Sequence, residues 1–566
     1  IDDIEFFPGG MPSKYGEVTQ SVINVRTDTQ SVEGRIVNLR VDFLDGGISW
    51  EERINQQTVL RVAGRYSWVG GIIANASRFA AWYAGAENFE PSYLTPEYWD
   101  GFADLRYKAT AEDEISFMLL SSRDTLVFHE GRSDEDGDGE LDPFEWEEEE
   151  LSYNPQHWID SSFWRARLRW VHTGEVHDHE TWVAGGLEEQ QNLLGAWWLS
   201  RQGPYRGRVG GPSVVARRDD RWKLNQFGEG SGIVHGTQIT ARWFTAEDFQ
   251  ETFDVQDYSE LEDVVTEDQQ LITSAWIEPQ WSTERFYVGA GLRAAFYAWE
   301  NQNSFQPEPR LTTRVTLPDE WIIKAAVGRY SQLPPLERYA QGIGNPNLEV
   351  MKAWQGSIGT EGELSNGISL DASLFGGHMT DLVVRDLEVD VYNNGDIVTT
   401  ELQPYYLGVE GIAYGLEVLA RVKPQQQPWW GWVSMTLAKA WRLDDEGNVF
   451  PSDYDQPISF NAVGNMELGK RWEMSGRVQY TSGQPFTPLS GVYVPDDSYF
   501  TAMRGALNSD RYPDYFRLDL RVQKELTTRH LEWMIYLDVY NVTARQNPFI
   551  ATYNYDYTEL LDIASI

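Results

Sequence analysis

The sequence predicts an all-β protein whose antiparallel strands close into a large transmembrane barrel. Segment after segment places an apolar residue at every second position, as between Trp164 and Trp170. Aromatic residues stand at the ends of such segments, and segments of about ten residues are separated alternately by short turns and long acidic loops. These three features are typical of strands that present one face to lipid and the other to a wide, wet lumen.

The alternation extends to the far end of the chain. It recurs over residues 368–374, 458–468, 516–522 and 531–539. A period of two gives each strand one apolar and one polar face, and a soluble β-sandwich would show the same pattern. The aromatic ends favour the barrel, because amphipathic rings collect at the two membrane interfaces. We also predict a hairpin of Leu311–Leu317 and Trp321–Tyr330, joined by a turn at residues 318–320.

Composition excludes several classes of function. The net charge of −41 argues against a nucleic-acid partner, which requires a basic face. The chain has no cysteine, so disulfides and thiolate sites are excluded. It contains no apolar run long enough for a transmembrane helix. We find no Ser-His-Asp arrangement, phosphate loop or dinucleotide motif, and therefore expect no enzyme; Gly70-Gly71 is interpreted as part of a strand and turn.

The N-terminal residues break the alternation and carry a family pattern. The run IEFFPGGMPSKYGEVTQSVINV, residues 4–25, resembles the final segment of the plug domain of TonB-dependent outer-membrane receptors. The matching residues are Pro8-Gly9-Gly10, Tyr15-Gly16 and Val22-Ile23-Asn24-Val25, with Ser21 where glycine is commoner. We therefore assign residues 1–30 to the end of a plug domain and residues 31–566 to the barrel.

Further stretches are similar to the same family, most strongly in the C-terminal half. They are AVGRYSQLPP (326–335), GNPNL (344–348), DQPISF (455–460), SGQPFTP (482–488), LNSDRYPDYFRLDLR (507–521) and VYNVTARQNP (539–548). The resemblance implies a barrel of about 22 strands, within the even-numbered range of such proteins. It also implies a larger plug and a closing C-terminal strand, so we expect this chain to lack the last strand and most of the plug.

One acidic loop predicts a calcium site. Residues 134–145 fit the D-x-[DN]-x-[DN]-G pattern with a final glutamate. The expected ligands are Asp134, Asp136, Asp138, Glu140, Asp142 and Glu145, with Glu140 binding through its backbone carbonyl. No apolar helix precedes the loop, so Ca²⁺ would staple an extracellular loop rather than open a helix pair. A solvated acidic loop is the alternative, and it is our interpretation of the neighbouring run 147–150.

Two other groups suggest binding. His177-Asp178-His179 has the ligand types of a metal site, although such triplets more often lie in solvated loops. The run WWGW at residues 429–432 is interpreted as part of an interfacial aromatic belt, with a carbohydrate-stacking platform as the alternative.

The resemblance implies a receptor in the bacterial outer membrane that imports a scarce solute with energy from TonB. The expected partners are outer-membrane lipid and lipopolysaccharide, TonB through a plug segment absent from this chain, and a small or oligomeric solute such as a siderophore, vitamin, saccharide or peptide. Two alternatives stay open: a non-transporting surface protein, adhesin or envelope-machine subunit on the same barrel, and a soluble all-β calcium-binding, carbohydrate-binding protein.

Overall fold

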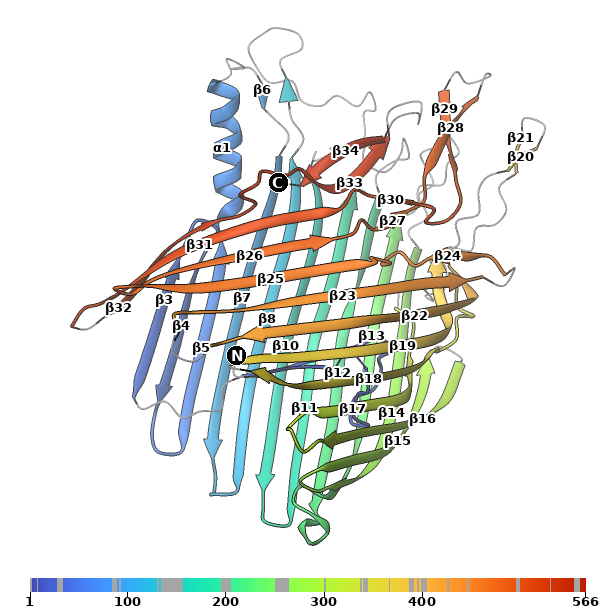
Figure 1. Ribbon diagram of the computed structural model, residues 1–566. Helices are drawn as coiled ribbons and strands as arrows, with labels where there is room; N and C mark the ends of the chain where they lie inside the picture. Colours follow the sequence, from blue (N-terminus) through green and yellow to red (C-terminus); the bar gives the residue numbers. More distant parts are fainter. Residues whose placement is uncertain are drawn as a thin grey trace.

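Twenty-two strands form one antiparallel sheet closed into a barrel (Figure 1), which confirms the predicted fold class. The computed structural model describes residues 3–7, 9–27, 34–83, 89–90, 93–129, 132–133, 156–194, 205–249, 264–299, 302–335, 338, 345–365, 367–385, 391–393, 396–398, 405–424, 427–444, 447–494, 499–529, 531–553 and 560–565. Within them, no helix has the length and apolar character needed to cross a membrane.

The barrel strands follow one another in chain order. They are β3 (Arg35–Val41), β4 (Asp45–Arg53), β5 (Thr58–Ser67), β7 (Tyr93–Lys108), β8 (Asp113–His129), β10 (Gln156–Thr173), β11 (His177–Leu194), β12 (Tyr205–Lys223), β13 (Gly232–Phe249), β14 (Val264–Ser282), β15 (Phe286–Trp299), β16 (Gln302–Thr316), β17 (Ile322–Gln332), β18 (Met351–Ser365), β19 (Ile368–Arg385), β22 (Tyr405–Val422), β23 (Trp429–Leu443), β24 (Val449–Pro451), β25 (Ile458–Gly469), β26 (Trp472–Thr481), β31 (Tyr515–Thr527) and β32 (Glu532–Val539).

Each strand pairs with the next, except that β24 and β25 both pair with β23, at different parts of its length. Where β32 meets the β3–β4 hairpin, the described contact is between side chains: Tyr536 Oη donates to Asp42 Oδ2 at 2.9 Å. Burial alone would raise the pKa of Asp42, but hydrogen bonds from the Asp45 and Leu44 backbone and from Arg40 lower it. The carboxylate at this junction is therefore held ionised.

The two rims of the barrel differ. Turns at one rim are short, as at residues 54–57, 174–176 and 470–471. The opposite rim carries helix α1 (Val69–Tyr83) and the small two-stranded sheets (Figure 1). These sheets pair β6 (Phe89–Glu90) with β9 (Arg132–Ser133), β20 (Val391–Asn393) with β21 (Asp396–Val398), β27 (Pro485–Phe486) with β30 (Asp510–Arg511), β28 (Leu489–Val494) with β29 (Tyr499–Arg504), and β33 (Asn547–Tyr553) with β34 (Leu560–Ser565). Short turns typify the periplasmic rim and long loops the extracellular rim.

Helix α1 corrects one expectation. Gly70 and Gly71 lie in its first turn, not in a strand and turn. The alternating pattern of the sequence did not predict a helix here, and two adjacent glycines have a low helix propensity. A second, much shorter helical element is the 3₁₀ turn η1 (Asn225–Phe227).

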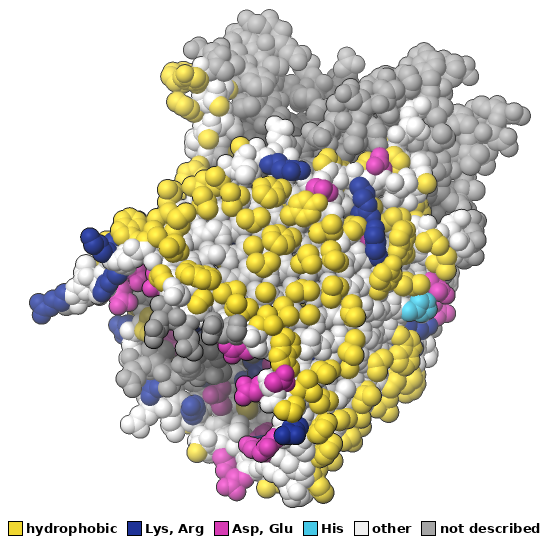
Figure 2. Space-filling view, viewed as in Figure 1, with side chains coloured by type: hydrophobic (Ala, Val, Ile, Leu, Met, Phe, Trp, Pro, Cys, Tyr) yellow, Lys and Arg dark blue, Asp and Glu magenta, His cyan; other side chains and the backbone are white. Residues whose placement is uncertain are grey.

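The alternating residues face where the pattern predicts. Leu168 and Leu374 are each 56% exposed on the outer face, although both are large apolar residues that water would disfavour. Figure 2 shows one side of the barrel, where hydrophobic side chains cover the sheet and most charged ones lie toward its margins. The predicted hairpin is present between β16 and β17, closed by Leu317 N donating to Trp321 O at 2.7 Å.

The strands are longer than the expected ten or so residues, which is about the number that a tilted strand needs to span the bilayer. Strands β12 and β14 each contain 19 residues. The additional residues continue the ladder beyond the hydrocarbon layer, because backbone pairing remains favourable outside lipid. Alternation marks the membrane crossing but not the end of the strand.

The outward position of Leu374 leads to a stability prediction. Leu374→Arg should lower the free energy of unfolding in lipid vesicles by about 2–4 kcal/mol, because it places a charge against the bilayer interior. Ser373→Arg is the matched control, since Ser373 faces the lumen opposite Glu417. We expect the control to change stability by less than about 1 kcal/mol. Equal losses in equilibrium urea unfolding would contradict the assignment of the two faces.

Candidate functional site

Residues 9–27, here called the lumen segment, lie inside the barrel against its inner wall (Figure 1). The segment follows β1 (Asp3–Phe7) and includes β2 (Val22–Arg26), which pairs with β1. Glu5 fixes this pairing by accepting hydrogen bonds from Asn24 and Arg26. The intervening chain makes a turn in which Tyr15 N donates to Pro12 O at 3.1 Å. The turn thus presents several backbone carbonyls to the wall.

Arg310 of β16 binds these carbonyls. Its Nη1 donates to Tyr15 O at 2.6 Å, to Pro12 O at 2.7 Å and to Met11 O at 3.3 Å. Its Nη2 pairs with Glu308 Oε2 at 2.6 Å. Glu308 is 0% exposed, so its charge depends on partners rather than on water. One guanidinium therefore joins a buried carboxylate to the lumen segment.

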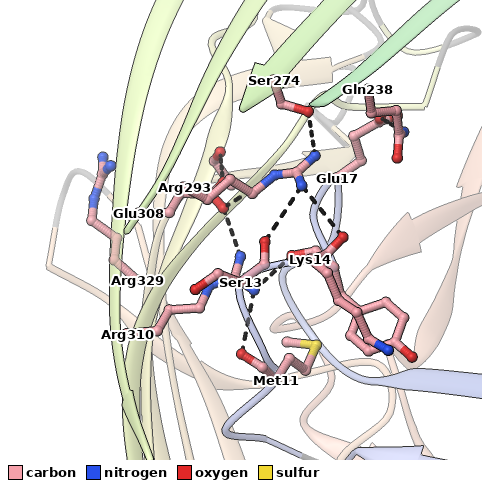
Figure 3. A network of polar contacts seen from close by, with 12 residues as sticks. Met11, Ser13, Lys14, Glu17, Gln238, Ser274, Arg293, Glu308, Arg310 and Arg329 are labelled. Carbon is pink, nitrogen blue, oxygen red and sulfur yellow. Dashed lines mark hydrogen bonds and ion pairs between the residues drawn. The ribbon is translucent and has the colours of Figure 1, made fainter. Parts of the chain in front are cut away.

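A second guanidinium reaches the same turn from the neighbouring strand. Arg293 of β15 is 0% exposed, and its Nη1 lies 3.5 Å from Ser13 O and 3.4 Å from Lys14 O. Its Nη2 donates to Ser274 Oγ, and its guanidinium stacks 4.9 Å from the centroid of the Trp276 ring. Figure 3 shows Arg293 and Arg310 reaching from the wall toward the segment.

Two glycines of the family pattern permit this close approach. A Cβ on Gly16 would collide with the guanidinium of Arg293. A Cβ on Gly10 would collide with Ala326 Cβ, and Gly10 also has a φ of +66°. Glycine is the residue that tolerates both conditions. The glycines that suggested the resemblance thus have a physical role in this structure.

Other side chains of the barrel wall form hydrogen bonds and an ion pair with the lumen segment. Ser13 N donates to Glu278 Oε2 at 2.7 Å, and Met11 N donates to Tyr330 Oη at 3.1 Å. Glu17 Oε2 pairs with Arg242 Nη2 at 3.0 Å. Polar contacts from three further strands, β14, β17 and β13, therefore fix the position of the turn.

Apolar packing completes the contact. Met11, Tyr330 and Ala353 are buried together, and Tyr15 and Val18 pack against them. The apolar part is small, whereas the polar contacts are numerous. Hydrogen bonds and ion pairs, which water can replace, therefore make up most of this interface.

The sequence did not reveal this site. Arg293 and Arg310 contact a segment almost 300 positions earlier in the chain, and Met11 and Arg310 are separated by 299 positions. The available signal was Glu308 and Arg310 at alternate positions, which placed two opposite charges on the lumen face of one strand. No pattern indicated which backbone they bind.

The predicted calcium ligands lie outside the described residues. They are Asp134, Asp136, Asp138, Glu140, Asp142 and Glu145. The strands on either side, β8 and β10, are paired, and the loop between them leaves from the long-loop rim. The calcium site stays a prediction.

The structure divides the predicted triplet His177-Asp178-His179. Asp178 points into the barrel, where its Oδ1 lies 2.8 Å from Lys223 Nζ. His177 and His179 share the outer face, and His177 Nε2 lies 3.0 Å from Asp220 Oδ1 of β12. The three residues that come together are thus His177, His179 and Asp220. Trp429 and Trp430 open β23 beside the short-turn rim, where a belt is expected.

Comparison with known proteins identifies relatives of the barrel. The model of a family described as "TonB dependent receptor-like, beta-barrel" matches residues 121–542. No curated protein sequence matches the chain at a significant level.

Solved structures share the fold at low sequence identity. The pyoverdine outer-membrane receptor FpvA of Pseudomonas aeruginosa is 12% identical, with a TM-score of 0.64 over 98% of this chain and 81% of that one. The ferric yersiniabactin uptake receptor FyuA of Yersinia pestis is 13% identical, with a TM-score of 0.65 over 97% and 81%. The copper transporter OprC is 11% identical, with a TM-score of 0.65 over 96% and 79%.

The grip of Arg310 on the lumen segment is testable by hydrogen exchange. Arg310→Met should lower the opening free energy of residues 9–27 by about 3–5 kcal/mol, since it leaves Glu308 buried without its closest cation. Arg329→Met is the control, because Arg329 lies one strand away and bonds to Pro307 O and Gln306 instead. Unchanged exchange of residues 9–27 in Arg310→Met would show that the contacts do not hold the segment.

Proposed function

Because this chain belongs to the TonB-dependent receptor family, we propose that it imports a scarce solute across the outer membrane. Its location is the bacterial outer membrane, as for the receptors that share its fold. Members of such a family act as transport receptors, and we propose no enzymatic step. Solute would bind at the extracellular rim and pass through the lumen.

The observation that carries this proposal is the lumen segment gripped by Arg293 and Arg310. A barrel of this many strands has a lumen wide enough for an aqueous channel. An importer must keep that lumen obstructed until energy is supplied. We propose that residues 1–30 are the end of a plug, and that TonB acts on the plug to exchange its polar contacts for water.

For the solute class we propose a ferric siderophore. FpvA and FyuA, which share the fold, are described with pyoverdine and as a ferric yersiniabactin uptake receptor. The net charge of −41 would disfavour a strongly anionic, uncomplexed ligand, and complexation with Fe³⁺ reduces the negative charge of a chelator. Vitamin, saccharide and peptide solutes are the competing classes.

Neither alternative function has support. A soluble all-β protein is wrong for this chain, because large apolar side chains cover the outside of the barrel and the family is one of membrane receptors. A non-transporting adhesin or envelope subunit would not need a segment held inside the lumen by the barrel wall. Nothing among the described residues favours it over a transporter.

We further propose that the loop at residues 134–145 binds Ca²⁺ through Asp134, Asp136, Asp138, Glu140, Asp142 and Glu145. The support is the spacing of oxygen ligands around Gly139. Strands β8 and β10 direct the loop to the rim with helix α1 and the small sheets, where extracellular calcium is accessible. The ion would offset the mutual repulsion of the carboxylates and order the loop.

Transport is tested with radiolabelled iron in cells that display the full chain in the outer membrane. Cells receive each of a panel of ferric siderophores, with and without a functional TonB. We expect one chelate to bind in both strains and to accumulate only with TonB, because binding needs no energy whereas displacement of the lumen segment does. Accumulation without TonB would contradict energy-coupled import. TonB-dependent uptake of another solute class, with no ferric chelate bound, would contradict the siderophore assignment alone.

Calcium binding is tested by calorimetry on detergent-folded protein. The wild type should give a one-site isotherm, and the double variant Asp134→Ala/Glu145→Gln should lose it, because the first monodentate and the final bidentate ligand are removed. The control Glu147→Gln/Glu148→Gln removes equal charge from the adjacent acidic run and should keep the isotherm. If both double variants weaken binding equally, the loop attracts Ca²⁺ by charge and holds no defined site.

A further inference from the structure

A row of titratable side chains crosses the outer face of the barrel near the short-turn rim. The strand ladders place His172 of β10 opposite His179 of β11, and His179 opposite Asp220 of β12. His177 lies two residues before His179 and therefore on the same face. The face is the outer one, because Val183 and Leu187 continue it along β11 and are half exposed.

The ligand atoms of three of these residues converge. His177, His179 and Asp220 each offer one atom, and these atoms all lie within 4.8 Å of one another. His177 Nε2 and Asp220 Oδ1 are 3.0 Å apart. Two ligands of a tetrahedral zinc ion with bonds of about 2.0–2.1 Å lie roughly 3.3 Å apart. One pair is thus already near that spacing, and the His179 atom, which lies within 4.8 Å of the other two, needs a shift of up to about 1.5 Å.

An unsatisfied polar atom points to the same place. The Nε2 of His179 is buried and has no hydrogen-bond partner among the described residues. The ring itself is fixed, since it stacks with His172 at 5.2 Å and meets the edge of Trp170 at 4.4 Å. A buried ring nitrogen without a partner is costly unless something binds it. A cation shared with His177 and Asp220 would satisfy it.

We propose that His177, His179 and Asp220 bind a divalent transition-metal ion on the outer face of the barrel, linking β11 to β12. Two imidazoles and one carboxylate suit Zn²⁺ and its first-row neighbours, whereas Ca²⁺ and Mg²⁺ prefer oxygen ligands alone. This ion is therefore chemically distinct from the one proposed for the loop at residues 134–145. A fourth position is left for water.

Neighbouring groups tune the site. Arg218 holds Asp220 with two hydrogen bonds, of 2.7 and 2.8 Å, and so competes with the ion for the carboxylate. His172 is occupied by Asp113, with Nδ1 3.0 Å from Oδ1, and it supports His179 by stacking rather than by ligation. Trp170 and Trp222 flank the cluster and are 43% and 46% exposed. Aromatic residues at this level mark the membrane interface, where dissolved ions have access.

The test is a Zn²⁺ titration of the full chain in detergent, with Ca²⁺ in excess to fill oxygen sites. Calorimetry gives the affinity, and the visible absorption of Co²⁺ bound in place of Zn²⁺ reports imidazole coordination. We expect one saturable site in the wild type. His179→Gln should weaken binding by more than about 10–100-fold, the range already seen when mere supporting groups are removed. Arg218→Gln should tighten binding, because it frees the Asp220 carboxylate.

His378→Gln is the matched control. His378 also lies on the outer face and pairs with one carboxylate, Glu410, at 3.0 Å, but no second histidine of the described chain joins that pair in a metal-binding cluster. The control should bind Zn²⁺ as the wild type does. An absence of saturable binding in the wild type, or equal affinity in the wild type, His179→Gln and Arg218→Gln, would overturn the proposal. The gain expected for Arg218→Gln keeps the test decisive if His179→Gln folds poorly.

Discussion

The structure depends on one constraint: a chain that crosses lipid must satisfy every backbone N–H and C=O by itself. The ladders that join each strand to the next from β3 to β32 meet that constraint along the sheet. Once the ladders are fixed, the period of two decides which side chain meets lipid and which meets the lumen. A slip of one residue in β10 would turn Leu168 inward and Arg167 and Arg169 toward lipid, so burial of the outer face also fixes the register.

The lumen site follows from the same division. Because the inner face is polar, the wall can carry Arg293 and Arg310 beside the buried carboxylate of Glu308. That arrangement is deficient in acceptors until the turn at residues 11–15 supplies its carbonyl oxygens. The wall is therefore complementary to a carbonyl-rich loop rather than to an acidic peptide. The segment must approach the wall closely for these hydrogen bonds to form, which explains why Gly10 and Gly16 are needed. The glycines of the family pattern therefore have a steric reason in this structure.

The sequence predicted what depends on local periodicity and left out what depends on long-range contact. The orientation of Leu168 and Leu374 and the turn at residues 318–320 followed from alternation and turn residues alone. Helix α1 did not, since a helix that begins with Gly70-Gly71 has a weak propensity signal. Arg293 and Arg310 were not predicted as site residues, because their partners lie near the N-terminus and no single-sequence pattern connects regions so distant. The resemblance did single out residues 8–25, and the structure explains why they matter.

The histidine row is a further consequence of the same periodicity. In His177-Asp178-His179 the two histidines of a strand must share one face, and the aspartate between them must face the opposite way. Strand geometry by itself therefore excludes Asp178 as a third ligand. A strand that presents two histidines outward can complete a metal site only with a side chain from an adjacent strand. Asp220 is 43 positions from His177, and it reaches the site because the register of β11 against β12 places it directly opposite His179. In a barrel, a site is assembled from neighbouring strands. The register between strands therefore determines which side chains meet, and the residue spacing within one strand does not.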